Sequence, residues 1–201
     1  NLNNTNQTIG SLSGGGATGG NISLGAGTLT ITQNAAGTYD GVISGSGNIT
    51  KIGTDTLILS RTNTFTGNTT INAGALSIGS DLQLGAAPAA ATTGKLTFDG
   101  GTLRTTASFA LNANRGITLN SGGGTLLVDP TFTLTYNGIA AGTGALTKSG
   151  TGSLSLGGVN SYTGATTINV GTVTTTIANA IANINSYTGA TTINVGTVTT
   201  T

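Results

Sequence analysis

The 201-residue chain contains no Cys, His, Met, Trp or Glu and only two Pro. Without His and Cys, neither a Ser-His-Asp nor a Cys-His catalytic arrangement can form, and zinc loses its preferred ligands. Without Cys there are no disulfides, so stability has to come from backbone hydrogen bonds and side-chain stacking. These absences exclude serine- and cysteine-protease mechanisms and argue against a zinc enzyme.

Charged residues are almost as scarce. Six Lys and Arg stand against five Asp, for a formal net charge of +1, and the basic residues form no cluster. Nucleic-acid binding requires a basic stripe that neutralises phosphates, so we predict no nucleic-acid partner. No run of 18 apolar residues occurs, so no membrane span is expected. The chain starts at Asn1 without a basic segment and apolar stretch, so we expect no signal peptide in it.

The chain is instead rich in Gly and in β-branched residues. It has 35 Gly, and 36% of its residues are hydrophobic, which is low for a compact globule. Disordered chains usually combine high charge with many Pro, and this chain has little of either. The composition favours a β-solenoid, whose thin core needs few apolar residues in each coil.

Internal repeats support this interpretation. Asn160–Thr176 and Asn185–Thr201 are identical at every position, and Asn63–Leu76 is a looser copy. At a 97-residue offset, Gly45–Thr70 aligns without a gap to Gly142–Thr167. Repeats with periods of roughly 20–50 residues indicate a solenoid. Because 97 is close to four times 24, we expect a coil, or rung, of about 20–25 residues, with the 97-residue copies four rungs apart.

Short alternating runs between Gly, Asn and Asp corners predict strands of three to five residues. We therefore predict an all-β chain: a right-handed parallel β-helix, a single domain over residues 1–201, with about three strands per rung and about eight rungs. Residues 1–20 are a possible irregular or capping segment, and Asp81–Thr93 is expected to bulge as a loop. The predicted core includes Leu57, Leu59, Ile71, Leu76, Phe98, Ile117, Leu119, Leu154, Leu156 and Ile168.

The identical copies should stack directly on each other. We predict that Asn185–Thr201 lies one rung beyond Asn160–Thr176 and in register, because identical residues stack best on themselves. Ile177–Ile184 lies between the two copies, which favours strands that complete a rung. Three alternatives explain so exact a copy: a recent duplication, design, or a sequence inferred by extending a motif.

The repeats resemble a known family, the autotransporter-associated β-strand repeat of type V secretion passengers. The resemblance rests on two long segments and three short ones, Gly45–Gly79, Gly142–Val173, Ser23–Ile31, Leu96–Arg104 and Gly122–Val128. It implies a right-handed parallel β-helix displayed on or released from Gram-negative cells, often adhesive or self-associating. A translocator barrel and a signal peptide are missing, so the resemblance implies a passenger fragment or a fibre subunit.

Two groups of residues resemble chemical sites. Gly14-x-Gly16-x-x-Gly19 matches a dinucleotide-binding pattern, but it neither follows a strand nor opens a helix, so a turn is expected. The five aspartates are isolated beside apparent turns, which favours corner positions, although stacking could bring two together as in polysaccharide-cleaving β-helices. They are Asp40, Asp55, Asp81, Asp99 and Asp129. The repeats carry no recurring Asp of the kind that calcium-binding nonapeptides need.

Three further groups have both a structural and a functional interpretation. Thr arrays, at Thr28-Leu29-Thr30, Thr172-Val173-Thr174 and Thr197-Val198-Thr199, suit a solvated strand face but also an ice-binding face. Asparagines in equivalent places of the repeat predict a stabilising Asn ladder: Asn72, Asn169 and Asn194. Aromatic residues in one turn motif predict a stacked column, with a carbohydrate platform as the alternative: Phe65, Tyr162 and Tyr187.

The sequence therefore predicts a non-enzymatic, extracellular structural or adhesive module with no catalytic, cofactor-binding or metal-binding residues. Its expected partners are copies of itself, stacked end to end or in a fibre, or cell-surface and glycan ligands. The expected location is extracellular, or the outer-membrane surface of a Gram-negative bacterium. The alternatives are a polysaccharide-active β-helix enzyme, supported by a pair of nearby carboxylates, and an ice-binding β-solenoid, supported by a flat face with two ranks of Thr.

Overall fold

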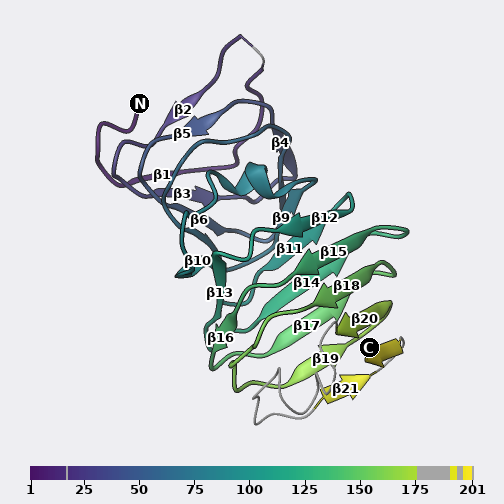
Figure 1. The fold of residues 1–201 in the computed structure, drawn as a ribbon. Helices are drawn as coiled ribbons and strands as arrows, with labels where there is room; N and C mark the ends of the chain where they lie inside the picture. Colours follow the sequence, from purple (N-terminus) through teal and green to yellow (C-terminus); the bar gives the residue numbers. More distant parts are fainter. Residues whose placement is uncertain (17, 176–190, 194–196, 201) are drawn as a thin grey trace.

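The computed structural model describes residues 1–16, 18–175, 191–193 and 197–200. In this part of the chain there are strands and one short 3-10 helix, η1 (Asp81–Leu84), but no α-helix. The strands pair in parallel to form a β-solenoid of about eight rungs, with the N-terminal rungs at one end and the C-terminal rungs at the other (Figure 1). The predicted all-β solenoid is therefore confirmed. No helix of the described residues is long and apolar enough to cross a membrane.

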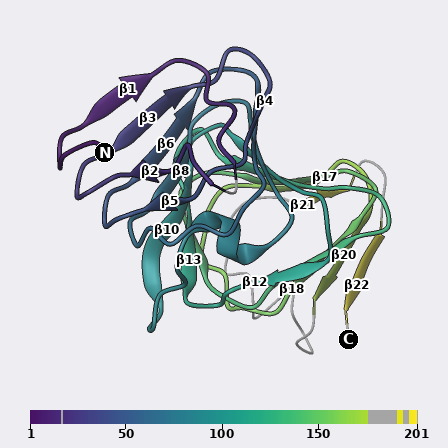
Figure 2. The same ribbon diagram turned by 90° about the horizontal axis from the view of Figure 1, so that it is seen from above.

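Each rung contributes to three faces. The first face consists of β1 (Gln7–Ile9), β3 (Leu29–Thr32), β6 (Ile49–Ile52), β8 (Thr69–Ile71), β10 (Thr92–Phe98), β13 (Arg115–Leu119) and β16 (Ala140–Gly142). Figure 2 shows the strands from β1 to β13 of this face side by side. The second face consists of β4 (Gly37–Tyr39), β7 (Thr56–Leu59), β9 (Ala75–Ile78), β11 (Thr102–Thr105), β14 (Gly124–Val128), β17 (Leu146–Ser149), β19 (Thr166–Ile168) and β21 (Thr191–Ile193).

The third face is interrupted. It begins with β2 (Ile22–Ser23) and β5 (Ile43–Ser44) and continues with β12 (Phe109–Leu111), β15 (Thr133–Tyr136), β18 (Ser153–Leu156), β20 (Thr172–Thr175) and β22 (Thr197–Thr200). The helix η1 lies between the two groups. The backbone N–H of Asn63 donates to the Leu82 carbonyl oxygen at 2.9 Å, and the N–H of Asn112 donates to Asp81 Oδ1 at 3.0 Å. About three strands per rung are thus present, and in some rungs η1 or an irregular segment takes the place of one strand.

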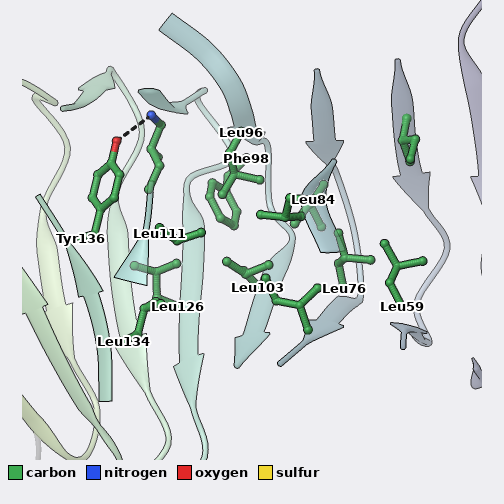
Figure 3. Close-up of a cluster of buried hydrophobic side chains, with 14 of the residues drawn as sticks. Leu59, Leu76, Leu84, Leu96, Phe98, Leu103, Leu111, Leu126, Leu134 and Tyr136 are labelled. Carbon is green, nitrogen blue, oxygen red and sulfur yellow. Dashed lines mark hydrogen bonds between the residues drawn. The ribbon is translucent and has the colours of Figure 1, made fainter. Parts of the chain in front are cut away.

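Alternation along each strand builds the core. In β7, Leu57 and Leu59 are buried while Ile58 between them is 39% exposed, as the period-2 geometry of a strand requires. In-register pairing stacks such residues into ladders: Leu76 of β9, Leu103 of β11 and Leu126 of β14 follow one another through the interior (Figure 3). All ten residues predicted as core are buried.

Rung length varies along the solenoid. On the first face, Leu29 pairs with Ile49 and Ile49 pairs with Thr69, so these two rungs have the same length. Thr69 then pairs with Leu96, which makes the next rung longer. The long rung contains η1 and the loop that follows it, as expected for Asp81–Thr93. After it, the pairing of Leu96 with Ile117 returns to a shorter step.

These unequal steps contradict one expectation. Four rungs on from Ile49, the first-face ladder arrives at Ala140, whereas the counterpart of Ile49 in the 97-residue repeat is Leu146. Leu146 lies on the second face, and Ile49 lies on the first. The expectation that the 97-residue copies are a whole number of rungs apart is wrong. The four rungs from Ile49 to Ala140 take 140 − 49 = 91 residues, so an offset of 97 residues carries the second copy six residues further, onto the next face.

The exact duplicate behaves as predicted wherever the structure describes it. Thr166–Ile168 of β19 pairs in parallel with Thr191–Ile193 of β21, and Thr172–Thr175 of β20 pairs with Thr197–Thr200 of β22. Both pairings join each residue to its own counterpart in the other copy, so the two copies are in register one rung apart. Ile177–Ile184, Tyr187 and Asn194 lie outside the described residues.

Candidate functional site

A column of threonines runs along the outside of the first face. The central residue of each strand pairs with the central residue of the next, and the inward neighbours, such as Leu29 and Ile31, are buried. The members of this first-face column are Thr8, Thr30, Thr50, Thr70, Thr97 and Thr118. At a strand spacing of about 4.8 Å, the column extends for about 24 Å. Its hydroxyl and methyl groups form a continuous uncharged surface.

The third face carries two such ranks. Outward positions two residues apart on β15, β18 and β20 are all Thr or Ser, and the register continues to β22. One rank is Thr133, Ser153 and Thr172, and the other is Thr135, Ser155 and Thr174. Residues two apart on a strand are separated by about 6.7 Å and adjacent rungs by about 4.8 Å, so the hydroxyls form a two-dimensional lattice.

The second face repeats the pattern. Four outward threonines pair in succession on β11, β14, β17 and β19: Thr102, Thr125, Thr147 and Thr167. The predicted Thr28, Thr30, Thr172 and Thr174 are therefore outward, and the pairing of successive rungs joins threonines of this kind into columns. The three faces together offer hydroxyl groups in regular ranks around the solenoid.

Few charges interrupt these faces. Arg61 pairs with Asp40 at 3.1 Å and Arg104 with Asp129 at 2.9 Å, each pair linking adjacent rungs. Hydrogen bonds from Ser60 and Arg61 lower the pKa of Asp40, and the hydrogen bond to Asp129 raises the pKa of Arg104. Because each exposed Arg has an acidic partner beside it, the surface presents little net charge to a ligand.

Two further positive charges are buried in the interior. Lys51 Nζ donates to the carbonyl oxygens of Gly53 and Ala73, both at 2.9 Å. Lys148, at the corresponding position of the longer repeat, donates to those of Gly150 at 2.6 Å and Val170 at 3.3 Å. Burial lowers the pKa of both amines, that of Lys148 to about 8. Each lysine thus ties the corner of its own rung to the corner of the next.

The glycines that follow these lysines make the contact possible. Gly53 and Gly150 have φ angles of +81° and +74°, which side-chain-bearing residues rarely adopt. A Cβ on Gly53 would lie 2.5 Å from the Gln33 carbonyl oxygen, and one on Gly150 would lie 2.2 Å from that of Val128. Gly is therefore required at this corner of the repeat.

The aspartates occupy different corners of the solenoid. Asp81 forms a buried ion pair with Arg115 at 3.0 Å, and Asp99 Oδ1 accepts the Gly122 N–H at 2.8 Å. Asp40 and Asp129 form ion pairs with arginines. Asp55 lies near Lys51 and raises the pKa of that amine, but the lowering by burial is larger. The Ser60 hydroxyl donates to Asp40 from the next rung, as the Gly122 N–H does to Asp99. This arrangement matches the expected corner role, and among the described residues no group of three or more acidic side chains could hold a metal ion.

Two predicted groups lie differently from expectation. Phe65 and Tyr162 are both buried, at 1% and 0% exposure, but they belong to different faces. The backbone N–H of Phe65 bonds to Ile43 of the third face, whereas the neighbours of Tyr162 bond to β16 of the first. The predicted shared column of these two is therefore wrong, because the 97-residue offset rotates the repeat by one face. Buried rings also cannot act as a carbohydrate platform.

Asn72 and Asn169 are exposed and lie on different faces, so these two do not share a column. The ladder of Asn169 with Asn194 stays a prediction, because Asn194 lies outside the described residues. Other asparagine side chains join successive rungs. Asn6 Oδ1 accepts the Thr28 N–H at 2.8 Å, and Asn48 Oδ1 accepts the Asn68 N–H at 2.8 Å, at the corner before the first face. In the interior, Asn63 bridges the rungs on either side of its own. Sequence reasoning missed both groups, although the Asn-x-Thr pattern before β6 and β8 marked the corner.

The glycine pattern lies between two strands and not at a strand-to-helix turn. Gly14 forms an isolated parallel bridge with Tyr39, and Gly16 forms an antiparallel bridge with Gly19. Both belong to the loop between β1 and β2, which opens no helix, as expected.

Comparisons with known proteins agree with the fold and the repeats. The family model of the passenger-associated transport repeat matches residues 49–78, 146–175 and 174–199. The chain is also similar to the "Adhesin BmaC autotransporter" of Brucella suis biovar 1 (strain 1330), with 38% identity over 152 residues. That alignment covers 76% of this chain but 4% of the relative, so the chain spans a small part of that protein's length. No solved structure matches the chain significantly.

Proposed function

The repeats of this chain belong to the passenger-associated transport repeat family of autotransporters, and we propose that the chain is a non-enzymatic adhesive module of such a passenger. It would lie outside the cell or on the outer-membrane surface of a Gram-negative bacterium. The observation that carries the proposal is the set of uncharged Thr and Ser ranks on a rigid parallel solenoid. The similarity to an adhesin supports the same function.

The physical basis is a large array of weak contacts. Each hydroxyl can donate one hydrogen bond and accept two, while each Thr methyl group adds a small apolar contact. The parallel ladder fixes the spacing, so little conformational entropy is lost when the face meets a complementary surface. Repetition along the rungs then multiplies individually weak contacts through avidity. The partners would be cell-surface glycans or other copies of the chain.

The experiment uses latex beads coated with the purified protein. We expect coated beads to adhere to cultured epithelial cells or to one another, and uncoated beads not to. A Thr50→Lys/Thr70→Lys/Thr97→Lys variant places three ammonium groups in the first-face column and should reduce adherence several-fold. The matched Thr→Ser variant at the same positions keeps the hydroxyls and should retain it. No adherence by the folded protein to either target would refute the proposal.

The two ranks on the third face favour ice binding as a second candidate function. Thr133 and Thr135, with the Ser and Thr residues stacked beyond them, form the regular hydroxyl lattice that such a function needs. Measurement of thermal hysteresis and ice-crystal shaping tests it. The candidate requires a freezing-point depression that Thr135→Lys/Thr174→Lys abolishes, and hysteresis indistinguishable from that of albumin would eliminate it.

A further inference from the structure

A small hollow opens on the first face where the inserted segment meets the next two rungs. It has a volume of about 60 Å³ and is lined by Ala91, Thr92, Thr93, Ala113, Gly116, Ile117, Ile139 and Ala141. Its walls are mostly apolar, and Ile139 at its rim is 48% exposed. The residues that form it come from three successive rungs.

A bulge in β10 creates the hollow. Thr92 pairs with Arg115 and Leu96 with Ile117, so three residues of β10 lie opposite the single residue Gly116. Two surplus residues must therefore bend away from the sheet, as in a β-bulge. A Cβ on Gly116 would lie 2.7 Å from the Thr92 carbonyl oxygen, so only Gly fits beneath the bulge.

The backbone groups beneath the hollow are already hydrogen-bonded from the interior. The Ile117 N–H donates to the buried Tyr136 hydroxyl at 3.2 Å, and that hydroxyl lies 2.8 Å from the Ile139 carbonyl oxygen. Hydrogen bonds also hold the inserted segment that forms one wall of the hollow. Asn114 Nδ2 donates to the Pro88 carbonyl oxygen at 3.0 Å, and Arg115 donates to that of Gly85 at 3.0 Å. The hollow is thus preformed.

Hydroxyl groups lie on one side of the apolar centre and close to it. Thr92 and Thr93 form one wall, and Thr118 of the first-face column lies under the bulge, 3.7 Å from the position of a Cβ on Gly94. No charged side chain lines the hollow. A volume of about 60 Å³ accommodates only a few water molecules, which suits a methyl or acetyl group but not a whole sugar ring or a large side chain.

We propose that this hollow binds the methyl-bearing group of a neutral sugar, a 6-deoxyhexose or an N-acetylhexosamine, in a surface glycan. The methyl group would enter the apolar centre while the ring hydroxyls meet Thr92, Thr93 and Thr118. The proposal rests on the adhesive function proposed above and specifies one ligand class for it.

A peptide fits this site less well. Peptides that bind to β-sheets usually add a strand to a free edge. Here β10 and β13 are paired on both sides, and the Ala140 and Gly142 carbonyl oxygens of β16 accept N–H groups of Ser161 and Thr163 at 2.8 and 2.9 Å. Because these strands offer no free edge, a ligand would contact the side-chain hydroxyls and the apolar centre, as a sugar can.

Methyl-detected NMR of the full chain tests the proposal. The probes are methyl α-fucoside, methyl α-rhamnoside and N-acetylglucosamine, with methyl α-glucoside as the control sugar. We expect at least one of the three probes to shift the Ile117, Ile139 and Ala141 methyl signals at millimolar concentration. The signal of Ile58, exposed on the second face, should stay unchanged. Which probe binds distinguishes a 6-deoxy from an N-acetyl ligand.

Two variants locate the binding. Ala141→Leu fills the hollow from its rim and should weaken binding about tenfold or more, which corresponds to about 1.4 kcal/mol. Ala26→Leu makes the same substitution at an exposed loop position between β2 and β3, outside the hollow and the hydroxyl ranks, and should bind normally. Ile139→Ala removes one wall without adding bulk and should also weaken binding. Unchanged binding in both hollow variants would overturn the proposal.

The outcome can be separated from that of the adhesion test. Bead adherence without any methyl shifts overturns the sugar site and leaves adhesion standing. Methyl shifts without bead adherence support the sugar site and refute adhesion. Methyl α-glucoside has a similar ring and the same O-methyl group but neither a C6 methyl nor an acetyl group. Equal shifts with this control sugar would therefore also overturn the proposal.

Discussion

Single polar side chains inside the solenoid hydrogen-bond to backbone groups of neighbouring rungs, which apolar residues cannot do. Lys51 and Lys148 donate to corner carbonyls of two rungs, and Asn63 bonds to the rungs on both sides of it. A thin coil has many corners whose backbone groups fall outside the strand ladders. Buried donors and acceptors have to satisfy those groups, because an unpaired buried polar group is costly.

The Lys148 amine should make stability depend on pH. Burial lowers its pKa from 10.5 to about 8, so between these values the unfolded chain holds a proton that the folded chain has released. The unfolded state then binds more protons, and stability rises with pH across this window. Urea denaturation from pH 7 to 10 should show a rise of roughly 2 kcal/mol.

The variant Lys148→Met should show a smaller rise over the same range. Burial also lowers the pKa of Lys51, so Lys51 contributes to the rise in the free energy of unfolding that is left in Lys148→Met. Lys51→Met should remove the contribution of Lys51. Above pH 10 the trend should reverse, because burial raises the pKa of Tyr136 to about 12. An identical pH profile for Lys148→Met and the original protein would contradict a buried, charge-destabilised amine.

Asn63 provides a second test at this scale. Its Oδ1 accepts the Ile43 N–H at 2.8 Å, and its Nδ2 donates to the Gln83 carbonyl oxygen at 2.6 Å. Asn63→Ala leaves both buried groups without a partner and should cost roughly 2–4 kcal/mol in urea denaturation. Asn72→Ala, at an exposed position, should change stability by less than about 0.5 kcal/mol. Equal effects would show that the interior bridge is unimportant.

Among the elements, the inserted segment with η1 differs most from the regular rungs. Arg115 of β13 holds it in place through Asp81 at 3.0 Å and the Leu84 carbonyl oxygen at 3.0 Å. The side chain of Arg115 is only 2% exposed. This clamp also positions the wall of the hollow on the first face.

Removing the clamp should be costly. Arg115→Ala leaves the Asp81 carboxylate, 13% exposed, without its partner, and should destabilise the protein by roughly 3–5 kcal/mol. Arg104→Ala breaks an Arg–Asp pair of similar geometry, in which Arg104 is 44% exposed, and should cost only about 0–1 kcal/mol. Thermal and urea unfolding of the two variants compare them directly. Similar losses for both would contradict a structural role of the buried pair.

Most strands could be predicted from the sequence, but their positions around the coil could not. Alternation such as that of Leu57 and Leu59 identifies a strand and its inward face, because the period of two is local. The placement of Leu146 one face away from Ile49 depends on the summed length of every intervening corner. The bulge at Thr93–Lys95 and the insertion around η1 add to that sum without any periodic signal.

The candidate surface was predictable in part for the same reason. Thr28-Leu29-Thr30 shows directly that its threonines point outward together. Their continuation into the first-face column is a property of pairing between successive rungs, whose residues are distant in the sequence. The hollow depends on Gly116 lying beneath the bulge, a contact that only the three-dimensional register reveals.

The whole molecule is a rod whose faces carry hydroxyl groups and few unpaired charges. Exposed arginines pair with aspartates, and Lys51 and Lys148 point into the interior. Screening by salt acts on exposed charges. An adhesive surface built from hydroxyl and methyl contacts should therefore bind independently of ionic strength.

Adherence of protein-coated beads, measured at 50 and 500 mM NaCl, tests the central claim most directly. At about 0.5 M salt the Debye length falls to a few ångströms, so attraction between charged surfaces largely disappears. The account predicts adherence that changes less than about twofold between the two concentrations, because uncharged contacts carry it. Absence of adherence at both concentrations, or a tenfold loss at the higher one, would contradict an adhesive module that acts through its hydroxyl faces.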